Sequence, residues 1–392
     1  TDSVASYTET LAALSGLRGT NFSAPGQVAE LLYGEEFGLR PAKLTDTGSR
    51  GSVDEEALTA LLAPPDLDPI AEQFIVTYMQ RTQATKYLGT YVEGIRGMLG
   101  PDDHIHHSLY ATNVVSGRYS HFLLTIPTQG DLGTAIRSCF IPPDGWVMGS
   151  WDLSQIELRV MAHLSGDKAM CEAFEEGVDL HALTAQRMFQ TPEPTKTQRR
   201  AAKTTNFLLQ YLGSPQALYA QFKMLGLPYT LDDAKRFHYQ WLHELYPGVL
   251  EYAKKVWREA RANDGIVEVP GSGRKRYLPG LLLEGSDWPI PFLRAEAQRQ
   301  AVNLHVQGAA HDRVKRATAK WWELRQAAEA AGDGPLAELV LEMHDEVLLY
   351  VPDNEEAKQA VDGTMRMLLT EEPLLVPVLA EGAYGYDWGS LK

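Results

Sequence analysis

Residues 147–159 read VMGSWDLSQIELR, a short apolar run that ends in an acid and leads into a helix-favouring segment. This pattern predicts a strand over residues 146–152 that presents Asp152 at its C-terminal end. Ser154 is expected to cap the following helix, which carries Glu157 and Arg159. A carboxylate fixed at a strand end makes a rigid metal ligand, although a single Asp there could also simply begin a turn.

A second decisive segment, residues 339–351, reads LVLEMHDEVLLYV. Two β-rich runs flank His344, Asp345 and Glu346, which predicts a hairpin with carboxylates at its tight turn. Acids at a hairpin turn can be merely solvated. Together with Asp152, however, they could hold two magnesium ions about 3.5 to 4 Å apart, the arrangement used for in-line phosphoryl displacement. Magnesium needs only one or two protein carboxylates besides substrate phosphates and water.

The third segment, residues 196–213, reads KTQRRAAKTTNFLLQYLG. Arg199, Lys203, Phe207 and Tyr211 recur every four residues, and each such step turns only about 40° around a helix, so the four are expected on one broad face. Cations suit a triphosphate and aromatic faces suit a base, which favours nucleotide binding. The alternative is an amphipathic helix with its aromatic residues in the core.

Three further clusters contain residues that could bind a ligand. The same four-residue spacing joins Arg299, Asn303 and Gln307, which suit minor-groove edges and sugars, or face solvent. The acid and histidine cluster at residues 102–107 is interpreted as a surface loop running into a strand, because no third ligand group accompanies it. The basic run at residues 274–276 contacts phosphate or is only solvated.

Composition restricts the class of protein. The 392 residues, 44% apolar and 22% charged, predict two or three subdomains and exclude disorder. The two cysteines fit a reducing compartment such as the cytoplasm, no apolar run approaches the ~20 residues of a membrane span, and the first residues lack signal-peptide blocks. The net charge is −15, but residues 196–299 hold 16 Lys and Arg against 10 Asp and Glu. A basic middle in an acidic chain indicates a polyanionic partner.

The order of expected elements predicts an α+β fold. Residues 4–14 and 70–99 are expected as helices of an arm, separated by a polar loop at 41–52. Strands are expected at 105–115 and 146–152, helices over 155–261, a Gly- and Pro-rich stretch at 270–291, a helix at 294–327, a loop at 328–335 and strands in the tail. This order places residues distant in sequence on one sheet.

Together these motifs resemble those of family A DNA polymerases, the DNA polymerase I type. DLSQIELR (152–159), RRAAKTTNF (199–207) with Tyr211, and MHDEV (343–347) resemble motifs A, B and C, in the family's order and spacing. Further matches are SGRYS (116–120), IP (126–127), MAHLSGD (161–167), DLH (179–181), YPGVLEY (246–252) and YDWG (386–389). The resemblance implies a right-hand fold, with a partial thumb and connecting helix at 1–104, palm at 105–170 and 294–392, and fingers at 171–293.

The resemblance also implies a role for individual residues in template-directed DNA synthesis with two magnesium ions. Asp152, Asp345 and the Leu153 carbonyl would bind the metals, with Glu346 in support. Nucleotide-binding residues would be His181, Arg199, Lys203, Phe207, Tyr211, Gln155 and Glu157, the last excluding ribonucleotides beside the sugar. Arg118, Arg299, Asn303, Gln307 and His344 would contact primer-template DNA.

The chain departs from the family's pattern at several positions. Leu208 and Leu212 stand where the family commonly has glycine, and GRLSS is replaced by GRYSH at residues 117–121. All residues are assigned to the polymerase core, so a proofreading exonuclease is expected to be absent or supplied by a separate partner. A compact or truncated phage-type polymerase is the favoured source.

Two other functions remain open from the sequence. A single-subunit RNA polymerase shares the architecture, but Glu157 and Phe207 argue against a pocket that admits a 2′-hydroxyl. A catalytically dead DNA clamp is disfavoured by the joint presence of Asp152, Asp345 and Lys203.

Overall fold

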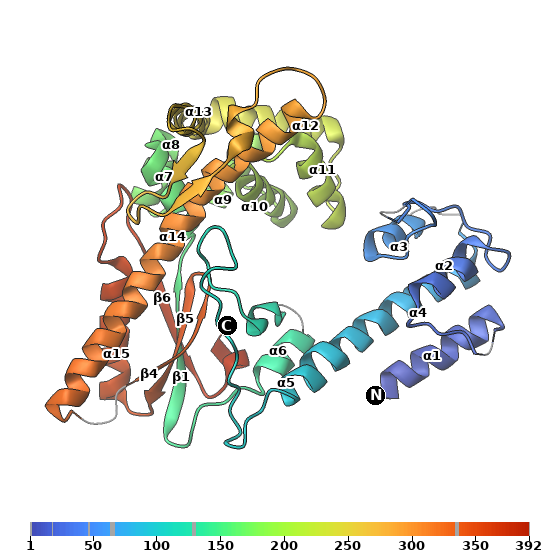
Figure 1. Ribbon diagram of the computed structural model, residues 1–392, viewed down its shortest axis with the longest axis horizontal. Coiled ribbons are helices and arrows are strands. Elements are labelled where there is room, and N and C mark those ends of the chain that lie inside the picture. Colours follow the sequence, from blue (N-terminus) through green and yellow to red (C-terminus); the bar gives the residue numbers. More distant parts are fainter. Residues whose placement is uncertain are drawn as a thin grey trace. The chain divides into compact units, whose positions relative to one another are not determined.

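The computed structural model describes residues 2–17, 19–45, 48–62, 67–127, 131–333 and 337–391. The chain divides into two compact units, Thr1–His107 and Ser108–Lys392, each with its own hydrophobic core. The first unit is helical and the second combines helices with a sheet (Figure 1). The α+β prediction is therefore confirmed.

The first unit is built around the pairing of its two longest helices. Leu11 of α1 and Phe74 of α4 lie in its core, where neither is exposed. The described parts confirm the predicted helices at 4–14 and 70–99 and contain no helix within the predicted loop at 41–52. Two short helices were not anticipated. The elements are α1 (Asp2–Ser15), α2 (Pro25–Tyr33), α3 (Glu55–Leu61), α4 (Pro69–Lys86), a π-helical turn η1 (Tyr87–Glu93) and α5 (Gly94–Arg96).

The strand predicted at residues 105–115 is wrong. All of these residues are described, and they form only isolated bridges, Leu99 with Ile105 and Tyr110 with Ser120. Leu109 and Val115 are exposed. The β-favouring side chains here find no neighbouring strand and no face to bury, so local pattern alone does not produce a strand.

A four-stranded antiparallel sheet in the order β4-β5-β1-β6 forms the centre of the second unit. Its strands are β1 (Trp146–Leu153), β4 (Glu338–Met343), β5 (Glu346–Pro352) and β6 (Ala380–Gly385). The predicted strand at 146–152 and the predicted hairpin are thus confirmed. Because side chains alternate along a strand, Trp151 and Val347 share one face and pack in the core with Met365 of α15 (Glu355–Thr370).

Helices make up most of the described segment between β1 and β4. The helices predicted over 155–261 are confirmed as α7 (Ile156–Ser165), α8 (Lys168–Glu175), α9 (Leu180–Phe189), α10 (Lys196–Leu209), α11 (Pro215–Met224), α12 (Leu231–Gln240), η3 (Trp241–Leu245) and α13 (Pro247–Ala262). Two short helices, η2 (Phe122–Thr125) and α6 (Asp131–Arg137), precede β1. In Figure 1, α14 (Ile290–Ala331) runs from the region of α12 and α13 down alongside the sheet.

Three differences concern the later part of the chain. A small hairpin, β2 (Ile266–Glu268) and β3 (Lys275–Tyr277), followed by the turn η4 (Pro279–Leu282), occupies much of the Gly- and Pro-rich stretch. The helix predicted at 294–327 extends over 42 residues. The tail is not all strand, because α15 intervenes after an Asn354 cap and before β6 and η5 (Trp388–Leu391). Within the described ranges, no helix is long and apolar enough to cross a bilayer.

Candidate active site

The antiparallel register brings the two predicted metal-binding segments to one end of the sheet. Asp152 of β1 lies directly opposite Glu346 of β5, so both side chains point to the same face. The Leu153 amide donates to the Asp345 carbonyl at 3.2 Å, which ties the end of β1 to the hairpin turn. Residues almost 200 positions apart thereby form one acidic group.

Two carboxylates of this acidic group are partly or fully buried. Glu346 is buried and accepts a 2.6 Å hydrogen bond from the Ser150 hydroxyl, two residues before Asp152 on the same face. Burial raises the pKa of Asp345, and the nearby Glu157 and Glu346 carboxylates raise it further, against the lowering effect of Arg118. A desolvated group of hard oxygen donors gains from a bound divalent cation.

Across the described ranges no three His, Cys, Asp or Glu side chains form a group that would hold an ion. The histidine and acid cluster at 102–107 is a loop whose Asp102 carboxylate lies 3.0 Å from His106 Nε2.

The start of α7 differs from the prediction. Ser154 does not cap the helix; the cap position is Gln155, in a left-handed conformation at φ 52°, with no side-chain capping bond. The Ser154 amide instead donates to the Leu379 carbonyl at 2.9 Å. The Ser154 carbonyl accepts from Arg159 Nε at 2.8 Å. Gln155 Oε1 is buried without a hydrogen-bond partner in the described part of the chain.

Helix α10 presents the predicted cationic and aromatic residues. Thr195 and Gln198 form a capping box that fixes its start. Arg199 is exposed and bonds Asp179 Oδ2 through Nε at 2.8 Å. One turn later, Lys203 Nζ lies 5.7 Å from the centre of the Phe207 ring, which is 40% exposed. These side chains face outward together, as the spacing predicts.

Tyr211 does not continue this helical face. Helix α10 ends at Leu209, and Tyr211 lies in the turn beyond it, so the expectation of four residues on one helix is wrong for this residue. Its hydroxyl donates to Glu157 and is also hydrogen-bonded by Gln307, while Arg118 donates to the other Glu157 oxygen. Burial first, and then the Glu157 carboxylate, raise the pKa of Tyr211, so its hydroxyl stays protonated.

His181 is placed by a residue that the sequence analysis missed. Asn206 is fully buried, and its amide nitrogen lies 2.9 Å from His181 Nδ1 while its oxygen accepts from Trp241 at 2.7 Å. His181 packs 5.5 Å from the Phe207 ring, and burial lowers its pKa to about 4. A polar residue on the apolar side of an amphipathic helix is the signal that would have found Asn206.

The remaining predicted DNA-binding residues lie on α14 and the hairpin turn. Arg299, Asn303 and Gln307 follow one another along α14 and are each half-buried. His344 is exposed at the turn between β4 and β5, in a left-handed conformation at φ 58°. Of these four, only Gln307 joins the Tyr211 and Glu157 network among the described contacts.

The fold matches a solved polymerase domain, and the comparisons with known proteins agree. The structure described as the POL domain of Pol1 from M. smegmatis in complex with DNA primer-template and dNTP aligns with a TM-score of 0.83 and 30% identity, covering 100% of this chain and 65% of that chain. DNA polymerase I, thermostable, of Thermus aquaticus is 33% identical over 378 residues, which cover 95% of this chain. DNA polymerase I of Lactococcus lactis subsp. lactis is 32% identical over 399 aligned residues.

The sequence matches DNA polymerase family A over residues 1–390. The chain belongs to this family. It spans 42% of the length of the Thermus aquaticus and Lactococcus lactis relatives.

Proposed function

We propose that this chain carries out template-directed DNA synthesis, joining dNTPs to a primer 3′-hydroxyl. The observation that carries the proposal is the acidic group formed by Asp152, opposite Glu346, with the adjoining Asp345 turn at one end of the sheet. It lies in a chain of DNA polymerase family A. The reaction joins the primer 3′-oxygen to the α-phosphate of the incoming nucleotide and releases pyrophosphate.

Two magnesium ions are the proposed cofactors. Asp152, Asp345 and the Leu153 carbonyl would hold them, with Glu346 in support, because these are hard oxygen donors of which Asp345 and Glu346 are partly or fully buried. When bound, such ions would lower the pKa of the attacking hydroxyl and neutralise charge on the triphosphate.

The outward face of α10 supplies the proposed nucleotide contacts. Lys203 and Arg199 bind the triphosphate as charge-assisted donors, and Arg199 exchanges its Asp179 contact for phosphate. Phe207 lies beside the sugar and Tyr211 beneath the new base pair, with His181 and Gln155 at the edges of the pocket. Glu157, held by Tyr211 and Arg118, occupies the space that a 2′-hydroxyl would need.

Primer-template DNA is the proposed partner. The solved relative of M. smegmatis carries primer-template and dNTP, and here Arg118, Arg299, Asn303, Gln307 and His344 are the proposed DNA contacts. The thumb is proposed at 1–104, the palm at 105–170 and 294–392, and the fingers at 171–293. The chain is proposed to act in the cytoplasm of a bacterium or of a phage-infected cell. A separate exonuclease or processivity factor is a second proposed partner.

Primer extension by the purified chain tests the function. Extension is expected with dNTPs and magnesium, and neither with NTPs nor in EDTA. Asp152→Asn and Asp345→Asn should each lower the rate by about a thousandfold or more while primer-template affinity stays within about threefold, since DNA affinity comes mainly from phosphate contacts.

Asp353→Asn is the matched control. Asp353 is exposed, and its carboxylate pairs with Lys358 at 2.7 Å at the other end of the hairpin. It should extend primers like the parent. Retention of a tenth of the parent rate by either site variant would refute the metal-ligand assignment. DNA binding without extension by the parent would indicate a clamp, and efficient use of NTPs would indicate an RNA polymerase.

A further inference from the structure

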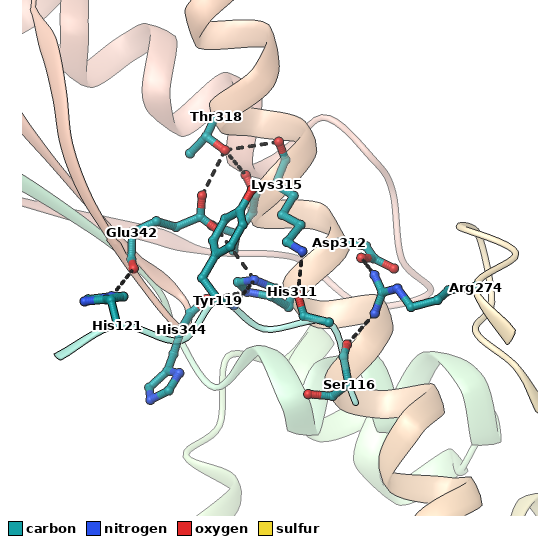
Figure 2. A network of polar contacts seen from close by, with 12 residues as sticks. Ser116, Tyr119, His121, Arg274, His311, Asp312, Lys315, Thr318, Glu342 and His344 are labelled. Atoms are coloured by element: carbon teal, nitrogen blue, oxygen red, sulfur yellow. Dashed lines mark hydrogen bonds and ion pairs between the residues drawn. The ribbon is translucent and has the colours of Figure 1, made fainter. Parts of the chain in front are cut away.

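His311 of α14 lies directly behind the hairpin turn that carries Asp345. It is 2% exposed, and its Nδ1 lies 2.9 Å from the carbonyl oxygen of His344. Its Nε2 lies 3.3 Å from the backbone nitrogen of Tyr119. Figure 2 shows the ring between the segment with Tyr119 and the turn with His344. One buried side chain therefore joins three elements.

The two backbone partners fix the protonation of this ring. The His344 carbonyl can only accept, so Nδ1 carries the proton, and the Tyr119 amide can only donate, so Nε2 is the acceptor. A doubly protonated ring would set two donors against each other at Nε2, and Glu342 Oε1, at 3.6 Å, lies beyond hydrogen-bond distance of that nitrogen. Burial lowers the pKa of His311 to about 4, in agreement with a neutral ring.

The contact with His344 acts on the peptide that precedes Asp345. His344 has a left-handed backbone at φ 58°, which is unfavourable for a residue with a side chain. The turn is held from one side by the Leu153 amide on the Asp345 carbonyl. His311 holds the neighbouring carbonyl of His344 from α14, so the peptides before and after Asp345 are each held by one hydrogen bond.

The contact with Tyr119 extends the same control to a second part of the site. Tyr119 follows Arg118, whose guanidinium donates to Glu157. The Tyr119 ring packs edge-on against His311 at 5.5 Å, and Lys315 lies 4.3 Å above its centre. The His311 ring therefore connects the segment that carries Arg118 to the turn that carries Asp345.

We infer that His311 is a positioning residue for the nucleotidyl-transfer site, which orients the Asp345 carboxylate through the His344 carbonyl and aligns the Arg118 segment through the Tyr119 amide. It touches no reacting group itself. Metal-ligating carboxylates need placement within a fraction of an ångström, and small displacements cost large factors in rate.

Two substitutions separate the two contacts. In His311→Asn the side-chain amide nitrogen takes the place of Nδ1 and can still donate to His344. In His311→Gln the amide lies at the place of Nε2, so its oxygen can accept from Tyr119 but the His344 contact is lost. His311→Ala loses both. His305→Ala is the matched control, since His305 is also buried on α14 but contacts the Tyr252 hydroxyl at 2.7 Å.

The first readout is deuterium uptake by the peptide at residues 338–352, measured without DNA, nucleotide or metal. Uptake is expected to rise by about tenfold in rate in the Ala and Gln variants and to match the parent in the Asn variant and in His305→Ala. Equal uptake in the Asn and Gln variants, or unchanged uptake in the Ala variant, would overturn the inference. The Asn and Gln comparison decides even where the Ala variant does not fold.

The second readout rests on the proposed function. At saturating dNTP, the Ala and Gln variants should lose at least about tenfold in kcat with the dNTP KM within about threefold, whereas Asn, which loses only the Tyr119 contact, should lose about threefold in kcat. A loss confined to KM, or shared equally by Asn and Gln, would overturn the positioning role. A parent that extends no primer refutes the proposed function alone, because the deuterium comparison still decides the role of His311.

Discussion

The Tyr211 hydroxyl donates a hydrogen bond to one oxygen of Glu157, and Arg118 donates to the other. Three segments far apart in the sequence thus meet at one carboxylate. Both Arg118 and Glu157 are largely shielded, with side-chain exposures of 19% and 15%. Glu157 is therefore held in place on both oxygens. The proposed exclusion of a 2′-hydroxyl by its bulk requires such a fixed position.

Glu157→Ala should weaken discrimination between dNTPs and NTPs by about tenfold or more, because truncation opens the space beside the sugar. Glu157→Gln keeps the bulk and should stay within about threefold of the parent. Competition between dATP and ATP for one primer measures the ratio. An equal loss in both variants would show that charge, rather than volume, provides the discrimination.

The turn after Tyr211 leads to a prediction about stability. Leu212 adopts φ 57°, in the left-handed region, whereas Leu208 has a helical backbone in the last turn of α10. Glycine tolerates positive φ but weakens a helix interior. Leu212→Gly should therefore be more stable than Leu212→Ala by about 1 kcal/mol, while Leu208→Gly should be less stable than Leu208→Ala by about half that amount, because Leu208 lies near the helix end.

Urea unfolding of the four variants measures both differences. Each comparison removes the same leucine contacts, so packing cancels within a pair. The same sign at positions 212 and 208 would mean that the backbone at Leu212 is not left-handed in solution.

The parts of the site that the sequence predicted are those encoded by local pattern. An apolar run ending in Asp152, and two β-rich runs around Asp345, define strand ends without knowledge of their neighbours. The α10 face carrying Arg199 and Lys203 follows from spacing alone. Register then brings the strand ends together, because an antiparallel sheet allows few arrangements of three such strands.

The missed features depend on contacts between distant segments. The end of α10 at Leu209 is set where Tyr211 turns to reach Glu157, a partner 54 residues earlier. From the sequence, His311 resembles any buried position of a long helix. Only the tertiary structure shows its contact with the hairpin turn. Residues 105–115 have strand-like composition but find no partner strand. Such outcomes follow from tertiary structure and not from propensity.

Phe207→Tyr should increase the use of dideoxynucleotides relative to dNTPs. The Phe207 ring is partly exposed beside Lys203, so a triphosphate held by this lysine brings the sugar towards the ring edge. Phenylalanine offers no hydrogen bond to replace those of a missing 3′-hydroxyl, and tyrosine does. One bond to a charged group is worth roughly 1.5 to 3 kcal/mol, or about 10- to 150-fold in relative incorporation.

Competition between ddNTP and dNTP on one primer measures this ratio. Ordinary dNTP extension should change little. Phe189→Tyr is a suitable comparison, because Phe189 packs with Phe237 at 5.0 Å in a separate aromatic cluster. A Phe207→Tyr ratio within twofold of the parent would contradict the position of the ring beside the sugar.

Glu342, on β4 behind the site, makes the stability of the chain depend on pH. It is 7% exposed, its Oε2 accepts from the Thr318 hydroxyl at 3.0 Å, and its Oε1 lies 3.6 Å from His311 Nε2. Burial raises the pKa of Glu342 from 4.5 to about 7, although Thr318 and Lys315 act in the opposite direction. The folded carboxyl thus keeps its proton at pH values where the unfolded one has lost it.

Between pH 4.5 and about 7, the folded state therefore binds more protons at Glu342 than the unfolded state, and the free energy of unfolding falls as pH rises. This contribution is complete below pH 4.5 and lost above about 7. Glu342→Gln cannot titrate, so its stability relative to the parent should increase across this window by up to about 3 kcal/mol and then stay level.

Urea unfolding at pH 5, 6, 7 and 8 measures the difference. Thr318→Val removes a hydrogen bond that lowers the pKa of Glu342 in the folded state, so it should move the upper limit of the window to higher pH. A Glu342→Gln difference that is constant from pH 5 to 8 would mean that the carboxyl is ionised in the folded protein throughout.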